Sequence, residues 1–295
     1  MRHALSGNGT HDTMRALGRE LRQRLPTPVK RAVRGIYNVV LDLAEGALGL
    51  RDDLTPPRRM IFVGDGDFKK VGQEFLSYFV ELGRLQRDAR VLDVGSGIGR
   101  MAVPLTGYLS PEGEYWGIDI VRDGIQWCID HIAPRFPNFH FQHADVFNGL
   151  YNPGGGLRAR DYRFPFADQY FDFVFLTSVF THMLPADLRN YLSEISRVLR
   201  PRGNAVVTFF LLNSESRALV AAGESRLSFR YAVEGCLTVD AQNPESAVAY
   251  DEGAVRALFS QHGFELEEPI RFGSWCGRKS YLSFQDIVLA RMARR

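Results

Sequence analysis

The stretch Val91-Leu92-Asp93-Val94-Gly95-Ser96-Gly97-Ile98-Gly99 combines a short apolar run with three glycines at alternate positions. The apolar run is typical of a buried strand. The glycines permit a tight turn, the approach of a ligand to the backbone and the close packing of a following helix. Because a helix N-terminus offers unpaired N–H groups, this arrangement favours a nucleotide-like ligand. The spacing alone does not separate such a site from a structural turn.

Extended and helical patterns alternate along the chain from about residue 60 onward. This alternation is typical of a parallel sheet covered by helices, so we expect an α/β fold. The apolar runs predict strands at 91–94, 115–118, 139–143, 171–176, 204–210, 264–268 and 282–290. Helical spacing predicts helices around 75–85, 101–109, 125–132, 188–199 and 255–259.

The composition changes near residue 59. Residues 1–59 hold eleven Lys or Arg and six Asp or Glu, whereas the whole chain of 295 residues carries a net charge of only +2. Apolar residues at helical spacing between Ile36 and Ala47 predict a short amphipathic helix. This helix could cover a substrate pocket, touch a membrane surface or pack on its own domain. We expect a basic, partly helical extension over 1–59 and one domain over 60–295, with a substrate-binding insertion at 211–250.

Charge, hydropathy and cysteine content disfavour several classes of protein. A net charge of +2 gives no long-range attraction to nucleic acid. No apolar run approaches the roughly 18 residues of a membrane span, and the first residues lack the apolar core of a signal peptide. Cys128, Cys236 and Cys276 are too far apart for paired metal ligands and are odd in number. We therefore expect a cytoplasmic protein with reduced cysteines and no transmembrane segment.

Acidic residues stand at or near the ends of three successive predicted strands. Asp119 ends the second strand, where a carboxylate can accept hydrogen bonds from ribose hydroxyls. Asp145 follows the third strand, where it can accept from an exocyclic amine, although either residue could instead cap a helix. Asp93 discriminates between ligands, because a carboxylate beside the glycines repels a pyrophosphate and attracts a cationic ligand. S-adenosylmethionine, an adenosine derivative with an ammonium, a sulfonium and no phosphate, fits this pattern.

With these motifs the sequence resembles the class I S-adenosylmethionine-dependent methyltransferase family over residues 70–210. The end of the chain is similar to a bacterial subgroup that acts on small molecules. The resemblance implies a Rossmann-like, seven-stranded, mostly parallel sheet with helices on both faces and an antiparallel last strand. The stretches that carry it are Val91–Gly99, Ile118-Asp119, Ala144-Asp145-Val146, Phe164–Val174, Arg197–Gly203 and, in the tail, Gly273–Arg278 and Gln285–Ile287.

The resemblance also implies roles for single residues. The cofactor-binding residues would be Asp93, Gly95, Ser96, Gly97, Gly99, Asp119, Ile120, Asp145 and Val146. The four loop residues from Gly95 to Gly99 would line the methionine moiety, and Asp93 would orient its ammonium through a backbone or water contact. Asp119 would hold the ribose, and Asp145 with Val146 the adenine. The family has glycine where this chain has Arg202, so we expect a type I turn with Gly203 at its last position.

The segment after the fourth strand bears on the reaction. Thr177–His182 lacks the Pro-Pro-aromatic box of adenine methylases, the Pro-Cys pair of cytosine methylases and the acids of a magnesium site. We therefore expect a metal-independent transfer to a small-molecule acceptor, at oxygen, with nitrogen and carbon as alternatives. His182 is the candidate general base because imidazole titrates near neutral pH, unless it caps the next helix or packs on the cofactor.

Two other functions remain open on the sequence. A nicotinamide-dependent oxidoreductase shares the glycine loop and the ribose acid but needs phosphate-friendly surroundings where Asp93 stands. A regulatory protein that binds the cofactor without catalysis would lack an acceptor site. Contacts to the acceptor should come from 1–59 and 211–250, and the oligomeric state is not predicted. The aromatic candidates for a pocket wall are Phe229, Tyr231, Tyr250, Phe272 and Trp275.

Overall fold

The computed structural model describes residues 39, 41–42, 48, 51–62 and 66–294. The chain divides into two compact units, Met1–Phe62 and Val63–Arg295. In the first unit Asp42 is buried, and its carboxylate accepts the backbone N–H of Arg58 at 2.6 Å and that of Arg59 at 3.2 Å. Both donors begin the short 3-10 helix η1 (Arg58–Met60). Most of the amphipathic helix expected around Ile36–Ala47 lies outside the described residues.

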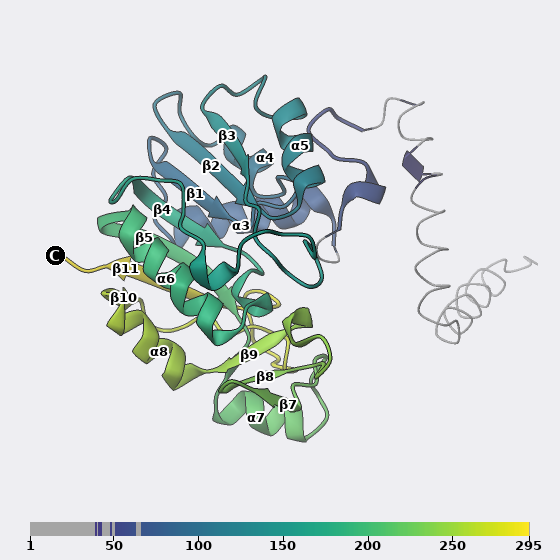
Figure 1. The fold of residues 1–295 in the computed structure, drawn as a ribbon, viewed down its shortest axis with the longest axis vertical. Coiled ribbons are helices and arrows are strands. Elements are labelled where there is room, and N and C mark those ends of the chain that lie inside the picture. Colours follow the sequence, from purple (N-terminus) through teal and green to yellow (C-terminus); the bar gives the residue numbers. More distant parts are fainter. Residues whose placement is uncertain (1–38, 40, 43–47, 49–50, 63–65, 295) are drawn as a thin grey trace, which may run out of the picture. The chain divides into compact units, whose positions relative to one another are not determined.

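The second unit is built on a seven-stranded sheet with the order β10-β11-β5-β4-β1-β2-β3 (Figure 1). β11 runs antiparallel to both of its neighbours, and the other pairs are parallel. This confirms the expected Rossmann-like sheet with an antiparallel last strand. The strands are β1 (Arg90–Val94), β2 (Glu114–Asp119), β3 (Phe139–His143), β4 (Phe171–Leu176), β5 (Leu199–Phe209), β10 (Phe264–Leu266) and β11 (Asp286–Met292).

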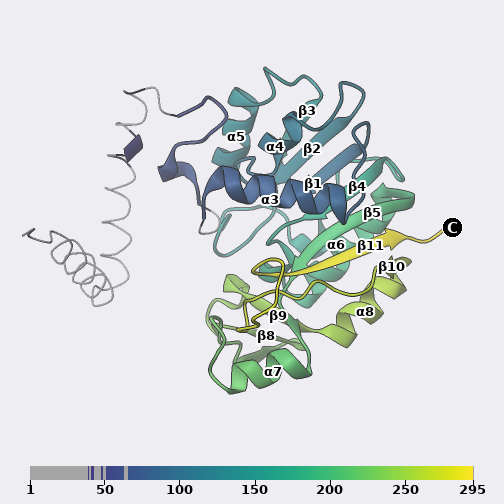
Figure 2. The ribbon, with the colours of Figure 1, turned by 180° about the vertical axis from the view of Figure 1, so that it is seen from behind.

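Helices cover both faces of this sheet, and β4 shows why its sequence is almost continuously apolar. Phe173 and Phe175 point to one face, where their rings lie 5.8 and 4.2 Å from that of Phe79. Val174 and Leu176 point to the other face and join the core under α6. α6 lies in front of the sheet in Figure 1, and α3 crosses its back in Figure 2. The helices are α3 (Phe68–Glu81), α4 (Ala102–Thr106), α5 (Arg122–His131), α6 (Pro185–Val198) and α8 (Glu252–Gln261).

The segment expected as an insertion folds into a second sheet of four strands with the order β6-β9-β8-β7. Its own small core contains Phe210, Phe229 and Trp275. A helix, α7 (Ser214–Ala221), begins in this segment with a capping box formed by Asn213 and Ser216. The strands are β6 (Leu211–Leu212), β7 (Tyr231–Val233), β8 (Cys236–Thr238) and β9 (Val248–Asp251).

Asp286 joins the small sheet to the large one. Its buried carboxylate accepts the N–H of Leu211 and of Gly273, both at 2.6 Å, and the indole N–H of Trp275 at 2.8 Å. The guanidinium of Arg278 lies 3.5 Å away. Burial raises the pKa of Asp286 to about 6, although these hydrogen bonds act in the opposite direction. The tail motifs that resemble a bacterial subgroup therefore form a structural anchor in this chain.

The turn before β5 differs from expectation. Arg202 has a φ of +66°, so the predicted type I turn is wrong. A Cβ on Gly203 would lie 2.2 Å from Cδ2 of Leu199 and 3.1 Å from the carbonyl oxygen of Asp172. The chain therefore needs glycine at position 203, where the backbone lies close to Leu199 and Asp172. Arg202 adopts the left-handed conformation of this turn.

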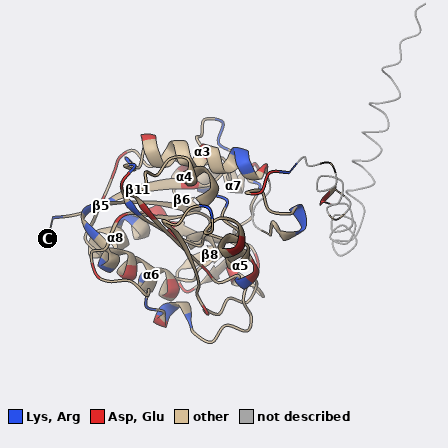
Figure 3. Ribbon diagram, turned by 90° about the horizontal axis from the view of Figure 1, so that it is seen from above, with Lys and Arg blue, Asp and Glu red and all other residues tan. Residues whose placement is uncertain are grey.

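Three further properties of the described part bear on the sequence predictions. Acidic and basic residues are interspersed along α6 (Figure 3). Among the described residues, no helix is both long and apolar enough to cross a membrane. Cys128, Cys236 and Cys276 are buried free thiols. The prediction that the cysteines form no disulfide scaffold is confirmed.

Candidate active site

The glycine loop has the conformation that its sequence predicts. Gly95, Gly97 and Gly99 all have positive φ, at 88°, 57° and 79°. A Cβ on Gly95 would lie 2.3 Å from Cγ2 of Val179, and one on Gly99 would lie 2.9 Å from Sγ of Cys128. Glycine is therefore required at both positions for space as well as for backbone conformation.

Asp119 is part of the same loop in three dimensions. Its Oδ2 accepts the backbone N–H of Gly97 at 2.7 Å, and its Oδ1 accepts that of Val121 at 2.7 Å. The preceding carbonyl, that of Ile118, accepts the N–H of Gly95 at 2.8 Å and that of Ser96 at 3.1 Å. Each carboxylate oxygen keeps a second lone pair that can accept from a hydroxyl. The predicted ribose acid and the glycine loop thus meet at one point.

Asp93 does not lie as the charge argument requires. Its carboxyl group is fully buried and accepts the hydroxyl hydrogen of Tyr115 at 2.7 Å. Burial raises the pKa of Asp93 well above its ordinary value, although the hydrogen bond from Tyr115 lowers it in part. Because this carboxyl group is buried and bonded to Tyr115, its charge does not by itself select a cationic ligand. A cofactor contact of Asp93 stays a prediction.

The remaining cofactor candidates also lie along the ends of β1, β2 and β3. Ser96 is buried, and its hydroxyl has no hydrogen-bond partner within the described part of the chain. Asp145 is exposed, and its Oδ2 accepts the N–H of Gly156 at 3.3 Å. Val146 is buried, and Ile120 is half-buried after β2. An unpaired hydroxyl, a glycine loop and a carboxylate at one sheet edge fit the hydroxyl-rich, cationic cofactor that the resemblance implies.

His182 lies at the end of the short helix η3 (Phe180–His182), which follows β4. Its Nδ1 is 2.8 Å from the carbonyl oxygen of Glu245. Because a carbonyl can only accept, Nδ1 carries the proton and Nε2 keeps a free lone pair. Burial lowers the pKa of His182, and hydrogen bonds that the ring donates to the backbone of Glu245 and Ser246 offset part of this effect. The ring is therefore held as a neutral base with a defined tautomer.

Two residues of this site were missed by the sequence reasoning. The ring of Tyr151 packs edge-on against His182, with 5.8 Å between the ring centres. Burial and the negative charge of Asp119 both raise the pKa of Tyr151. Glu245 supplies the carbonyl that orients His182 from 63 residues away. No periodicity or motif connects Glu245 with His182 in the sequence. Tyr151 was visible as an aromatic residue beside a glycine-rich loop, but that signal is not specific for an active site.

The aromatic candidates for the pocket wall separate into core and surface residues. Phe229 and Trp275 belong to the core of the small sheet. Tyr231 is exposed on β7, and the ring of Phe272 lies 4.8 Å from the guanidinium of Arg278. Only the hydroxyl of Tyr250 reaches the neighbourhood of His182, where it donates to the carbonyl of Met183 at 2.7 Å.

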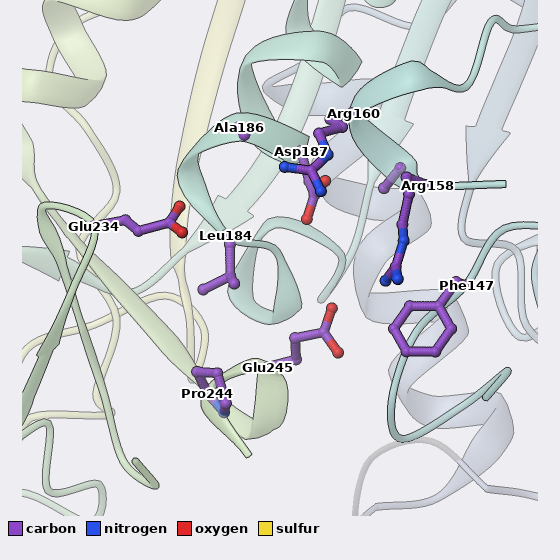
Figure 4. A pocket seen from close by; sticks show the side chains of 10 residues that line it. Phe147, Arg158, Arg160, Leu184, Ala186, Asp187, Glu234, Pro244 and Glu245 are labelled. Atoms are coloured by element: carbon purple, nitrogen blue, oxygen red, sulfur yellow. The ribbon is translucent and has the colours of Figure 1, made fainter. Parts of the chain in front are cut away.

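A cavity of about 280 Å³ lies next to Glu245, whose carbonyl oxygen holds His182, although His182 itself is not part of the lining (Figure 4). Two of the lining residues are close to His182: Leu184 follows it by two positions, and Glu245 accepts its hydrogen bond. Among the described residues, no group of three or more His, Cys, Asp or Glu has the arrangement of a metal site. The full lining is Phe147, Arg158, Ala159, Arg160, Leu184, Ala186, Asp187, Glu234, Pro244 and Glu245.

Comparison with known proteins agrees with this geometry. Residues 91–203 match a family model described as a methyltransferase domain. The PH0226 protein from Pyrococcus horikoshii OT3 shares the fold, with a TM-score of 0.54, 18% identity, and coverage of 79% of this chain and 94% of that protein. A S-adenosylmethionine-dependent methyltransferase from Methanosarcina mazei gives a TM-score of 0.49 at 18% identity, with 73% and 98% of the two chains covered.

The matched residues include the glycine loop, Asp119, Asp145 and His182, and they lie in the sheet and helices described above. The family model and the glycine loop thus fall on the same part of the chain. Residues 91–203 form a methyltransferase domain on a Rossmann-like fold.

Proposed function

We propose that the protein transfers the methyl group to a hydroxyl oxygen of a small-molecule acceptor, without a metal ion, and that His182 is the general base. The observation that carries this proposal is the hydrogen bond from Nδ1 of His182 to the carbonyl of Glu245. This bond leaves Nε2 as the basic nitrogen, and burial lowers the pKa so that the ring is unprotonated near pH 7. A transfer to oxygen needs such a base, because the hydroxyl must lose its proton.

Different residues of the chain bind the cofactor and transfer the proton in this proposal. S-adenosylmethionine, when bound, supplies an electrophilic methyl group on a sulfonium. The loop from Gly95 to Gly99 and Asp119 bind the cofactor in the proposal, with Asp145 and Val146 at its adenine. Nε2 of His182 takes the proton from the acceptor hydroxyl as the C–O bond forms; the bond between the methyl group and sulfur would break in the same step, and the cofactor would leave as an uncharged thioether. Alignment of the reacting groups can contribute roughly 7–11 kcal/mol to such a displacement.

Other parts of the proposal rest on composition. The net charge of +2 supports a small-molecule acceptor over a nucleic acid, and the odd number and wide spacing of the cysteines support a cytoplasmic site of action. The segments 1–59 and 211–250 contribute acceptor contacts in this proposal, and a peripheral membrane contact of 1–59 is the alternative role for that segment.

The test is a His182→Gln variant assayed with a labelled methyl donor against a broad set of small acceptors. We expect turnover to fall by about 10²–10⁴-fold while the dissociation constant of the cofactor changes little, because general base catalysis contributes on this order. His262→Gln is the matched control, since His262 lies at the end of α8 with Nδ1 on the carbonyl of Leu258. Equal losses of turnover and cofactor affinity would make His182 a packing residue.

The same assay separates the alternatives to this function. A regulatory protein would bind the cofactor and methylate none of the acceptors. A nicotinamide-dependent oxidoreductase would bind NAD(H) and leave S-adenosylmethionine unbound in a calorimetric titration.

A further inference from the structure

The cavity next to Glu245 is built jointly by the methyltransferase core and the small sheet. The core contributes the segment from Phe147 to Arg160 and the start of α6 around Asp187. The small sheet contributes Glu234, in the turn between β7 and β8, and Glu245. A volume of about 280 Å³ is close to the lower end of the range for small-molecule sites. The cavity therefore suits a compact ligand.

The charged side chains of the cavity are distributed unevenly. The carboxylates of Asp187, Glu234 and Glu245 point into it from three sides (Figure 4). Asp187 and Glu245 are partly buried, and the positive charge of Arg158 acts on both of them. Arg158 is exposed, and its guanidinium lies 4.4 Å from the centre of the Phe147 ring. The lining of the cavity thus combines three carboxylates with two guanidiniums, and Arg160 lies against Asp187 (Figure 4).

The carboxylates also act on one another. Burial raises the pKa of Asp187, the backbone N–H and the positive charge of Arg160 lower it in part, and the negative charge of Glu234 raises it. Burial likewise raises the pKa of Glu245, and the charge of Asp187 adds to this effect. Like charges that meet in a partly buried space are relieved by a cation placed between them. Three carboxylates and two guanidiniums leave one net negative charge in the lining, which one ammonium group balances.

Glu245 links the cavity to the proposed base. The carbonyl of Glu245 holds His182, while the side chain of the same residue lines the cavity and accepts the N–H of Gly149 at 2.9 Å. An acceptor seated there would present its neighbouring atoms to the histidine.

We propose that this cavity is the acceptor subsite and that it selects compact amino alcohols, with the protonated amine between Asp187 and Glu245 and the hydroxyl directed to His182. The inference rests on the proposed function. It also explains the choice of atom, because carboxylates that surround an amine keep it protonated and therefore without the lone pair that a nitrogen methylation requires. The hydroxyl is left as the nucleophile.

The test compares three probes that share one ring: trans-4-aminocyclohexanol, cyclohexanol and trans-4-hydroxycyclohexanecarboxylic acid. Binding is measured by calorimetry with the cofactor present, and methylation is measured with a labelled donor. For the wild-type protein we expect the amine to bind at least tenfold more tightly than the neutral alcohol and the acid to bind most weakly. Equal binding of amine and alcohol, or preferred binding of the acid by the arginines, would overturn the inference.

Three variants assign the preference to the cavity. Asp187→Asn and Glu245→Gln should each remove most of the tenfold preference for the amine, because both retain size and hydrogen bonding but lose the charge. Glu265→Gln, an exposed acid on β10, is the matched control and should keep it. Asp187→Glu keeps the charge and should therefore retain part of the preference for the amine. Thermal unfolding of each variant checks that the fold is retained. Preference that survives both cavity substitutions contradicts the proposal.

His182→Gln separates this inference from the proposed function. We expect this variant to lose methylation and to keep the preference for the amine in the binding measurement. A wild-type protein that methylates cyclohexanol and ignores the amine would leave the methyltransferase function intact and refute the subsite. A protein that binds the amine with this preference but methylates the nitrogen would refute the assignment to oxygen.

Discussion

The two sides of the candidate active site are held together by different kinds of contact. On the cofactor side, main-chain groups of the glycine loop bind the carboxylate of Asp119, and positive φ angles fix the loop. On the acceptor side, carboxylates and guanidiniums from four separate segments face one cavity. Main-chain contacts tolerate little change in shape, whereas side-chain charges can change without moving the backbone. The cofactor side is therefore suited to one constant ligand, and the acceptor side to selectivity that differs from protein to protein.

The anchor of the acceptor side provides the prediction with the largest expected effect. The pKa of Asp286 is about 6 in the folded protein and 3.8 in its ordinary state, so the folded form binds a proton more readily than the unfolded one. The raised pKa of Asp286 therefore adds to the free energy of unfolding. This contribution is fully present below pH 3.8 and is lost as the pH rises toward 6. The loss is up to about 3 kcal/mol.

Urea unfolding of the wild type and of Asp286→Asn between pH 4 and 7 measures this contribution. The difference in unfolding free energy between the two proteins should decrease by up to about 3 kcal/mol over this range. Glu265→Gln serves as a control, because an exposed acid should give a difference that is flat with pH. Parallel profiles for wild type and Asp286→Asn would show that the anchor does not titrate in this window.

The cofactor side is tested by Asp119→Ala. This change removes an acceptor from two backbone N–H groups and, in our proposal, from the ribose hydroxyls. A charged hydrogen bond of this kind contributes roughly 1.5–3 kcal/mol, so we expect the dissociation constant of S-adenosylmethionine to rise about tenfold or more. Calorimetric titration provides the measurement.

Asp145→Ala sharpens the comparison within the same sheet edge. Asp145 is exposed, whereas the side chain of Asp119 is nearly buried. Asp145→Ala should therefore raise the dissociation constant of S-adenosylmethionine less than Asp119→Ala does. An unchanged affinity in Asp119→Ala would rule out the ribose assignment, and a larger effect at Asp145 would reverse the ranking of the two acids.

The same contrast explains how much could be predicted from the sequence. The glycine loop and the acids after β2 and β3 are local patterns, because each residue acts where its own strand ends, and the structure gives the predicted order of elements. The contact between Glu245 and His182 joins residues 63 positions apart and depends on how the small sheet packs. The burial of Asp93 was missed for another reason. A strand covered on both faces is apolar throughout, so its sequence does not say which way the acid points.

Arg202→Gly is the prediction with the smallest expected effect, and it acts outside both sides of the site. Arg202 adopts a φ of +66°, which costs a residue with a Cβ about 1–2 kcal/mol. Glycine removes this strain but adds conformational entropy to the unfolded chain, so the net gain in unfolding free energy should be about 0.5–1 kcal/mol. Urea unfolding measures it, and cofactor affinity and turnover should not change. Gly203→Ala should instead destabilise the protein, because the added Cβ would meet Leu199 at 2.2 Å. If Arg202→Gly lowers stability as well, contacts of the arginine outweigh its backbone strain.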